Sequence, residues 1–303
     1  MPLSDFDQLY RDADDRREPV AVAAAGGADR TVIEALGLAR ERGWVTPMVI
    51  GPAAAIAEAA EACGVDLAGF RVIDAEGPGI AEAAVAEVRS GRAGILLKGQ
   101  VSTPDLMRAV QAPEDGLRAG KVIAQVVLME VRRDGRRFLL ADPGVLIRPN
   151  LAKKVEILRG CLSVAHALGV AVPKVALLAA IEAPSVTMPE TVEAAELQRR
   201  NRDGEFPGGI VQGPLSFDLA YAVDAGDKKR IGGPVVGAAD VMIFPDLGSA
   251  NLTVKAIMYT ADCRFGGILI GTSHPVAFMS RADTVATRLN SLALALKLVP
   301  PVR

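Results

Sequence analysis

Short apolar runs alternate with amphipathic segments through the first third of this chain, at intervals of roughly 25 residues, which is typical of βα units. The apolar runs lie at 20–25, 46–51, 70–75 and 94–99. The segments between them, TVIEALGLARERG, AAAIAEAAEACG and IAEAAVAEVRSG, carry Ala, Leu and Glu at helical spacing, and each ends at a glycine suited to a helix C-terminus. The pattern predicts an α/β fold with a mainly parallel sheet and helices on its faces.

The middle of the chain changes character at KVIAQVVLMEVRRDGRRFLLADPG. Two β-rich runs flank Asp134-Gly135, which predicts a hairpin. Strand and helix patterns then resume, and TVATRLNSLALALKL predicts a final helix. A length of 303 residues with 50% hydrophobic side chains suits two compact lobes. We expect the first lobe to comprise 1–126 with 284–303, and the second to comprise 127–283.

Composition excludes several classes of protein. Lys and Arg total 34 against 36 Asp and Glu, so a net charge of -2 provides no general attraction for nucleic acid or anionic lipid. No uncharged apolar run approaches the roughly 18 residues needed to span a membrane. Three scattered cysteines and two distant histidines favour reduced thiols over disulfides or a zinc site. We therefore expect no metal. We also expect a cytoplasmic protein, because the start of the chain is polar and acidic.

Four segments that follow predicted strands combine glycines, hydroxyls and charges. They are KGQVSTPD (98–105), QGPLSFD (212–218), FPDLGSAN (244–251) with Lys255, and MSRAD (279–283). Ligands of open parallel sheets bind beyond the carboxyl ends of the strands, so these segments are the candidate site. None is a Walker A loop or a G-x-G-x-x-G motif.

The first segment fits an anion site. Ser102 or Thr103 precedes Pro104, a pattern typical of the first turn of a helix, whose free backbone N–H groups attract anions. Lys98 at the strand end would add a cation. The alternatives are an N-cap hydroxyl that only starts the helix, and a lysine at the exposed rim.

The fourth segment places Ser280, Arg281 and Asp283 within four residues. Together they supply a hydroxyl donor, a planar cation that can hold two phosphate oxygens, and a potential base. The alternative is a surface ion pair between Arg281 and Asp283, with Ser280 as a helix cap.

Read together, GPLSFDLA, ADVMIFPDLGSANLTVK and HPVAFMSRAD followed by LNSLALAL resemble the carboxyl half of the phosphate acetyl/butyryltransferase family. KGQVST resembles the phosphate loop of its amino half, and TMPETVEAAEL resembles a helix of its butyryl branch, as does the SRAD form. The resemblance covers roughly residues 95 to 297, in order and with similar gaps.

The resemblance implies two α/β/α lobes related to isocitrate and isopropylmalate dehydrogenases, with the active site in the interlobe cleft and a homodimer as the usual assembly. It implies reversible transfer of a short acyl group between coenzyme A and inorganic phosphate, without a cofactor or a covalent intermediate. Ser280 and Arg281 match the pair that holds the phosphoryl group. Lys98, Ser102 and Thr103 lie in the phosphate loop, and Asn251 and Lys255 match positions that line the cleft.

Two positions depart from the family pattern. Thr287 stands where the acetyl branch has the aspartate assigned to deprotonate the CoA thiol, so Asp283 is the available substitute. Ala250 replaces the glycine of a Gly-Asn turn, which predicts a narrower turn or a shifted Asn251. Three alternatives remain: a metal- and NAD-dependent decarboxylating dehydrogenase, a phosphate acyltransferase of lipid synthesis that acts on acyl carrier protein, and a catalytically weak ligand-binding or scaffolding homologue.

Overall fold

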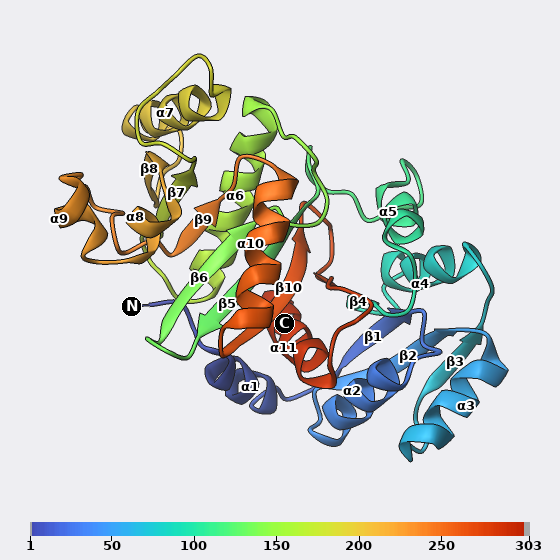
Figure 1. Ribbon diagram of the computed structural model, residues 1–303. Helices are drawn as coiled ribbons and strands as arrows, with labels where there is room; N and C mark the ends of the chain where they lie inside the picture. Colours follow the sequence, from blue (N-terminus) through green and yellow to red (C-terminus); the bar gives the residue numbers. More distant parts are fainter. Residues whose placement is uncertain (1, 300–303) are drawn as a thin grey trace. The chain divides into compact units, whose positions relative to one another are not determined.

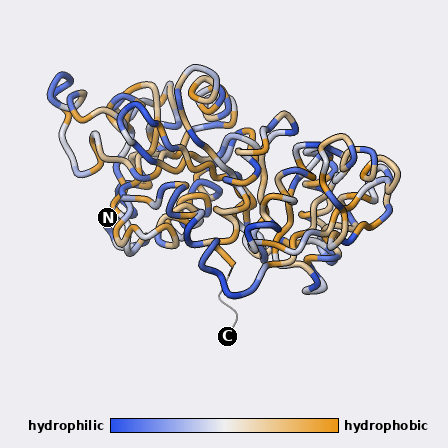
Figure 2. The backbone as a smooth tube through the Cα atoms, turned by 90° about the horizontal axis from the view of Figure 1, so that it is seen from below, coloured by the Kyte–Doolittle hydropathy of each residue, from blue (hydrophilic) through white to orange (hydrophobic). Residues whose placement is uncertain are grey.

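The computed structural model describes residues 2–299, which divide into two units. Unit 2 comprises residues 6–120 together with the chain from Phe265 onward, and unit 1 comprises residues 121–264 with the N-terminal residues up to Asp5. Hydrophobic stretches recur along both units (Figure 2). Alternating strands and helices confirm the predicted α/β class.

Unit 2 begins with a run of βα units (Figure 1). In chain order its elements are α1 (Phe6–Asp14), β1 (Val20–Ala25), α2 (Arg30–Glu41), β2 (Val45–Gly51), α3 (Ala53–Cys63), β3 (Arg71–Asp74), α4 (Gly79–Arg89), β4 (Ile95–Lys98), α5 (Thr103–Gln111), β10 (Cys263–Ile270, mostly in this unit), β11 (Val276–Ala277) and α11 (Val285–Leu298). All four predicted apolar runs form strands, and the predicted final helix is confirmed.

The strand order in unit 2 is β3-β2-β1-β4-β11-β10. Every pairing in it is parallel except the one between β10 and β11. From β1 the chain moves outward to β2 and β3, then returns across the sheet to β4 on the other side of β1. Since such crossovers are right-handed, α2 and α3 cover one face and α4 the other. The order therefore reverses between β1 and β4, which makes this the topological switch point of the unit.

Unit 1 contains the predicted hairpin. β5 (Ala124–Val131) pairs antiparallel with β6 (Arg136–Ala141), and Gly135 at the turn has a φ of 69°. The remaining elements are α6 (Leu151–Ala167), β7 (Lys174–Leu178), α7 (Pro189–Arg202), β8 (Ile210–Leu215), α8 (Phe217–Tyr221), α9 (Ala225–Lys229), β9 (Val241–Ile243) and α10 (Leu247–Thr260). The strand order β5-β6-β9-β7-β8 is parallel from β6 onward.

The segment from Phe265 to Asp283 belongs to unit 2. The boundaries expected from sequence, 127–283 for one lobe and 284–303 for the return to the other, place it in the opposite lobe. Strand pairing explains the difference, because the two residues of β11 pair in parallel with Leu96 and Leu97 of β4. The segment that carries Ser280 and Arg281 therefore leaves the same sheet as Lys98.

Side-chain caps begin several of the helices that flank the predicted site. Asp29 accepts a hydrogen bond from the Val32 amide at the start of α2, and Asp246 accepts one from Ser249 at the start of α10. Thr284 caps α11, which is buried along most of its length and packs against α1 and α2. These caps fix where each loop ends and each helix begins.

Candidate active site

Three neighbouring parallel strands of unit 2 direct their carboxyl ends toward one edge. β4 lies between β1 and β11, with Ala25 of β1 in register with Lys98 and Ala277 of β11 in register with Leu97. The segments that follow these strands are Gly26–Asp29, Gly99–Thr103 and Phe278–Asp283, and Lys98 is the last residue of β4. The edge lies at the switch point, where open α/β sheets bind their ligands.

The backbones that follow β1 and β4 approach each other closely. The Gln100 amide donates to the Gly26 carbonyl oxygen at 2.8 Å, and Gly99 donates to Ala25 at 2.8 Å. Gly26 has a φ of 83°, and a Cβ there would lie 2.5 Å from the Gln100 carbonyl carbon. A Cβ on Gly99 would lie 2.3 Å from the Gly26 oxygen. Only glycine fits at either position, so the loop after Lys98 is fixed by backbone contact.

Lys98 is 3% exposed, although it is a charged residue at the end of a strand. Burial, with a smaller contribution from the Arg281 and Arg288 guanidinium groups, lowers the pKa of its amine to about 8, although the Asp283 carboxylate acts in the opposite direction. Of the two interpretations of Lys98 that sequence left open, the exposed rim lysine is therefore wrong. Lys98 is a buried amine in a cluster with two guanidinium groups and one carboxylate.

Arg288 connects the elements of this cluster, and the sequence reasoning missed it. Its side chain is 2% exposed on α11. It donates from Nε to Thr31 Oγ1 at 2.8 Å, from Nη1 to the Lys98 carbonyl oxygen at 3.2 Å and from Nη2 to the Arg281 carbonyl oxygen at 3.5 Å. Asp29 Oδ1 lies 3.8 Å from Nη2. The available signal was an arginine directly before the apolar run LNSLALAL, since buried charges need partners.

Ser280 and Arg281 are exposed, whereas Asp283 is 7% exposed. The Ser280 hydroxyl accepts a hydrogen bond from the Ala282 amide at 3.2 Å. The Arg281 guanidinium forms no ion pair within residues 2–299. The buried position of Asp283 differs from the surface pair that sequence offered as an alternative. Arg281 and Asp283 both act electrostatically on the Lys98 amine, so these three side chains form one charged cluster.

Ser102 is the N-cap of α5. Its hydroxyl accepts from the Asp105 amide at 3.1 Å and donates to the Asp105 carboxylate at 2.5 Å. The helix-cap interpretation of Ser102 therefore describes its present contacts. Thr103 is the first residue of α5 and is half-buried, and its hydroxyl has no hydrogen bond to any described residue.

Thr287 sits in the first turn of α11 and is 5% exposed. Its amide donates to Thr284 Oγ1 at 3.2 Å, and the two hydroxyls lie 3.1 Å apart. Thr287 thus takes part in helix capping, and its neutral hydroxyl is too weak a base to replace a carboxylate as proton acceptor.

Asn251 and Lys255 belong to unit 1, one turn apart on α10. Asn251 donates from Nδ2 to the Pro143 carbonyl oxygen at 2.9 Å, and Lys255 is exposed. Ala250 is helical and fully buried, so its backbone does not need the glycine that the family turn carries.

Asp142 shapes the loop that carries Pro143. Its carboxylate accepts from the amides of Gln125, Gly144 and Val145 through Oδ1 and from Leu146 through Oδ2, at 2.8–3.1 Å. Burial raises the pKa of Asp142, while these amide donors favour its ionised form. These hydrogen bonds to Asp142 fix the conformation of the loop and with it the position of the Pro143 carbonyl that binds Asn251.

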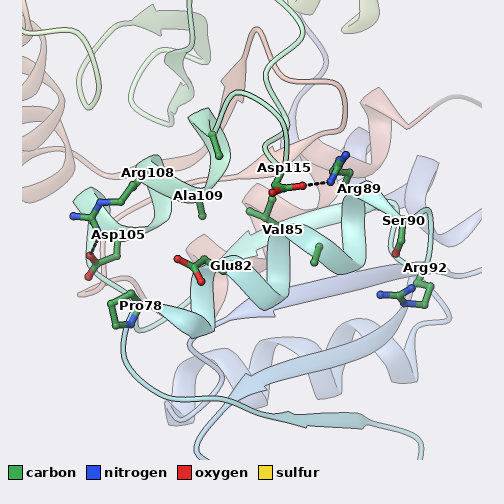
Figure 3. A pocket seen from close by; sticks show the side chains of 12 residues that line it. Pro78, Glu82, Val85, Arg89, Ser90, Arg92, Asp105, Arg108, Ala109 and Asp115 are labelled. Atoms are coloured by element: carbon green, nitrogen blue, oxygen red, sulfur yellow. Dashed lines mark hydrogen bonds and ion pairs between the residues drawn. The ribbon is translucent and has the colours of Figure 1, made fainter.

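A separate concave region of about 710 Å³ lies between α4 and α5. Figure 3 shows its lining side chains, among which Arg89 pairs with Asp115 and Arg108 with Asp105. Its lining includes none of the predicted site residues. Because its arginines already pair with carboxylates, this groove has little free charge for an anion.

Within residues 2–299, no three His, Cys, Asp or Glu side chains gather as ligands of a metal ion would. No helix among these residues combines the length and the apolar character needed to cross a bilayer.

The fold and the strand-end cluster define an α/β protein with clustered cations at the switch point of a parallel sheet. Comparison with known proteins gives its family. The sequence profile of phosphate acetyl/butaryl transferases matches residues 79–296, and the chain belongs to that family of acyltransferases.

Individual relatives agree with this assignment. The chain is 36% identical to the phosphate butyryltransferase of Clostridium acetobutylicum over 92% of this chain and 93% of the relative. It is also 36% identical to the phosphate acetyltransferase of Thermotoga maritima, over 96% of this chain and 98% of the relative. The structure of a branched-chain phosphotransacylase from Enterococcus faecalis aligns with a TM-score of 0.81 and 29% identity, covering 92% of this chain and 99% of that one.

Proposed function

We propose that this protein transfers a short acyl group reversibly between the sulfur of coenzyme A and inorganic phosphate, at the carboxyl ends of β1, β4 and β11. The observation that carries the proposal is the Arg281 guanidinium, which is exposed and has no ion-pair partner within residues 2–299. It stands in a cluster that also contains the cations Lys98 and Arg288. Such an arrangement suits a phosphate dianion.

In this proposal Arg281 and Ser280 bind the phosphoryl group, because a planar guanidinium can hold two phosphate oxygens and a hydroxyl can donate to a third. Asp283 completes the catalytic group as its acidic member. Lys98, Ser102 and Thr103 form the phosphate loop, in which the Thr103 hydroxyl is available to a ligand while Ser102 caps α5. Asn251 and Lys255 of unit 1 bind the acyl-CoA substrate.

Electrostatic attraction explains how the cluster of cations would accelerate the reaction. Phosphate and the leaving thiolate are both anionic, so cations fixed in advance lower the barrier more than mobile water does. A group of this kind typically contributes about 10²–10³ in rate. Resident metal chemistry is no part of the proposal, since the cations that bind the anion are side chains.

The test is the release of CoA thiol from acetyl-CoA and from butyryl-CoA, each with and without phosphate. Phosphate-dependent release from either substrate supports the proposal, and the ratio of the two kcat/KM values assigns the preferred acyl length. Binding of both ligands without turnover would favour a scaffolding homologue. Turnover of a hydroxy acid only with NAD and magnesium would favour a dehydrogenase.

We also propose a cytoplasmic homodimer. The exposed side of α10 supports self-association, because Leu252 and Tyr259 are 71% and 78% exposed although both are large and apolar. The three cysteines are free thiols, as in a reducing compartment. Light scattering should give twice the mass of the chain, and Leu252→Glu should reduce it to that of a monomer. A monomeric native protein would contradict this part of the proposal.

A further inference from the structure

The proposed reaction moves a proton as well as an acyl group. Phosphate enters as HPO₄²⁻, and CoA leaves as a thiol whose ordinary pKa is about 8.5. The departing sulfur must gain a proton in one direction and lose it in the other. Such a transfer is most efficient when the pKa of the protein group lies near both the operating pH and the thiol pKa. An ordinary carboxylate, with a pKa of about 4, is poorly matched to that task.

The acidic side chains at the carboxyl edge of unit 2 already have structural contacts. Asp29 caps α2 and lies 3.8 Å from Arg288, and Asp105 binds Ser102 and pairs with Arg108. Asp283 is buried and acts on Lys98 by charge. Arginines do not release a proton at physiological pH. Lys98 is the remaining group of this cluster that can both donate and accept.

We propose that the Lys98 amine is the general acid–base group that carries the proton to and from the sulfur of coenzyme A. This inference rests on the proposed function and assigns the step for which Thr287 offers no base. It depends on three features of Lys98: its position at the switch point, the burial of its side chain, and the charged groups around it.

The charges around Lys98 explain how it can serve both directions. Arg281 and Arg288 lower the pKa of the amine, together with burial, to about 8. A phosphate dianion bound to Arg281 would screen that repulsion and favour the ammonium form. The ammonium can therefore donate a proton to the departing thiolate, and the neutral amine that results can accept a proton in turn. Asp283 favours the ammonium form of Lys98, and Arg288 acts as a positioning residue that holds the Lys98 carbonyl.

The step balances without any further reactant. An unprotonated oxygen of HPO₄²⁻ attacks the thioester carbonyl carbon, and the carbon–sulfur bond breaks. The Lys98 ammonium donates its proton to the departing thiolate. The proton left on the new acyl phosphate then passes to the neutral amine and restores the ammonium. In reverse, the neutral amine removes the thiol proton as sulfur attacks the acyl phosphate.

The first test compares Lys98→Arg, which keeps the charge but cannot release a proton, with Lys98→Met. Lys228→Met is the matched control, because Lys228 is an exposed lysine of α9 paired with Asp224. We expect kcat of both Lys98 variants to fall by about 10²–10⁴-fold in both directions, which is the usual contribution of acid–base catalysis. KM for phosphate should rise in Lys98→Met and change little in Lys98→Arg.

A second variant distinguishes proton transfer from a loss of fold. Lys98→Cys treated with 2-bromoethylamine carries a less basic amine in place of lysine, and the wild type treated in the same way controls for Cys63, Cys161 and Cys263. We expect the alkylated variant to regain activity, with the limb of its pH–rate profile displaced to lower pH. A displaced limb shows that the rate follows the basicity of this amine.

Two results would overturn the inference. One is a Lys98→Arg enzyme with the wild-type kcat, since charge alone would then be sufficient. The other is an alkylated variant whose activity returns with an unchanged pH limb. Both are distinct from a failure of the proposed function, which would appear as a wild-type protein without phosphate-dependent CoA release.

Discussion

The Arg288 guanidinium donates a hydrogen bond to the carbonyl oxygen of Lys98 at 3.2 Å, across 190 positions of sequence. The final helix thereby holds the end of the strand that carries the proposed acid–base group. The same guanidinium reaches Thr31 and the Arg281 carbonyl. One buried side chain thus links the segments that follow β1, β4 and β11.

Replacing Arg288 by Met should reduce both stability and activity. Each buried acceptor left without its donor costs about 1–3 kcal/mol, and Thr31 and Lys98 would each lose one. We expect a lower melting temperature and a kcat at least about tenfold lower, which corresponds to a barrier increase of about 1.4 kcal/mol. Thermal denaturation and steady-state assays measure both effects. An unchanged kcat in a folded variant would show that Arg288 does not support the site.

Arg281→Ala should leave the fold intact and impair the reaction. The side chain is exposed and forms no ion pair within residues 2–299, so little packing is lost. We expect kcat/KM for phosphate to fall by about 10²–10³-fold. Arg89→Ala is the control, because that arginine pairs with Asp115 on the surface of the α4–α5 groove. Equal losses in both variants would argue against a phosphate contact at Arg281.

Lys98→Met should stabilise the protein while it lowers kcat by about 10²–10⁴-fold. The folded pKa of about 8 lies below the ordinary 10.5, so the native state disfavours the ammonium form. Native stability should therefore rise as pH increases from 8 towards 10.5, where the unfolded chain binds more protons. The wild-type penalty below that window is about 3 kcal/mol.

The measurement is the melting temperature of the wild type and of Lys98→Met at about pH 7 and about pH 10. We expect the difference between the two melting temperatures to shrink at the higher pH. A variant that melts below the wild type at neutral pH would show that the lysine stabilises the fold.

Gly26→Ala should destabilise the protein more than Gly43→Ala. Both glycines have positive φ, 83° and 75°, so both substitutions carry a backbone cost of about 1–2 kcal/mol. Only Gly26 faces a neighbouring backbone, because nothing lies within 4 Å of a Cβ added at Gly43. The additional loss at Gly26 measures the close approach of β1 and β4. Urea denaturation of the two variants compares them, and equal losses would contradict the contact.

Local patterns were readable from the sequence. The Asp134-Gly135 hairpin and the Ser102-x-Pro start of α5 each depend on residues a few positions apart, and the structure has both. The same locality explains why Ser102 could be read both as an anion donor and as a cap, since both uses require a hydroxyl at that position. Whether the predicted residues act together on substrate stays a prediction.

Non-local relationships were not readable. β11 is two residues long, too short for a periodic pattern, and its pairing with β4 determines which unit carries Arg281. Arg288 looks like one polar residue in an apolar helix until its partners 190 and 257 positions away are known. The burial of Lys98 follows from those same contacts, which is why sequence alone left its exposure open.

The division of the chain into two units also constrains the order in which its parts can fold during synthesis. Most of unit 2 precedes residue 121, but the unit is completed only by β11 and α11, after residue 264. During synthesis, the β4 edge that will pair with β11 must wait while the entire second unit emerges from the ribosome. Unit 1, which is nearly continuous in sequence, can fold first, and the edge that carries the proposed phosphate site is then the last part of the chain to assemble.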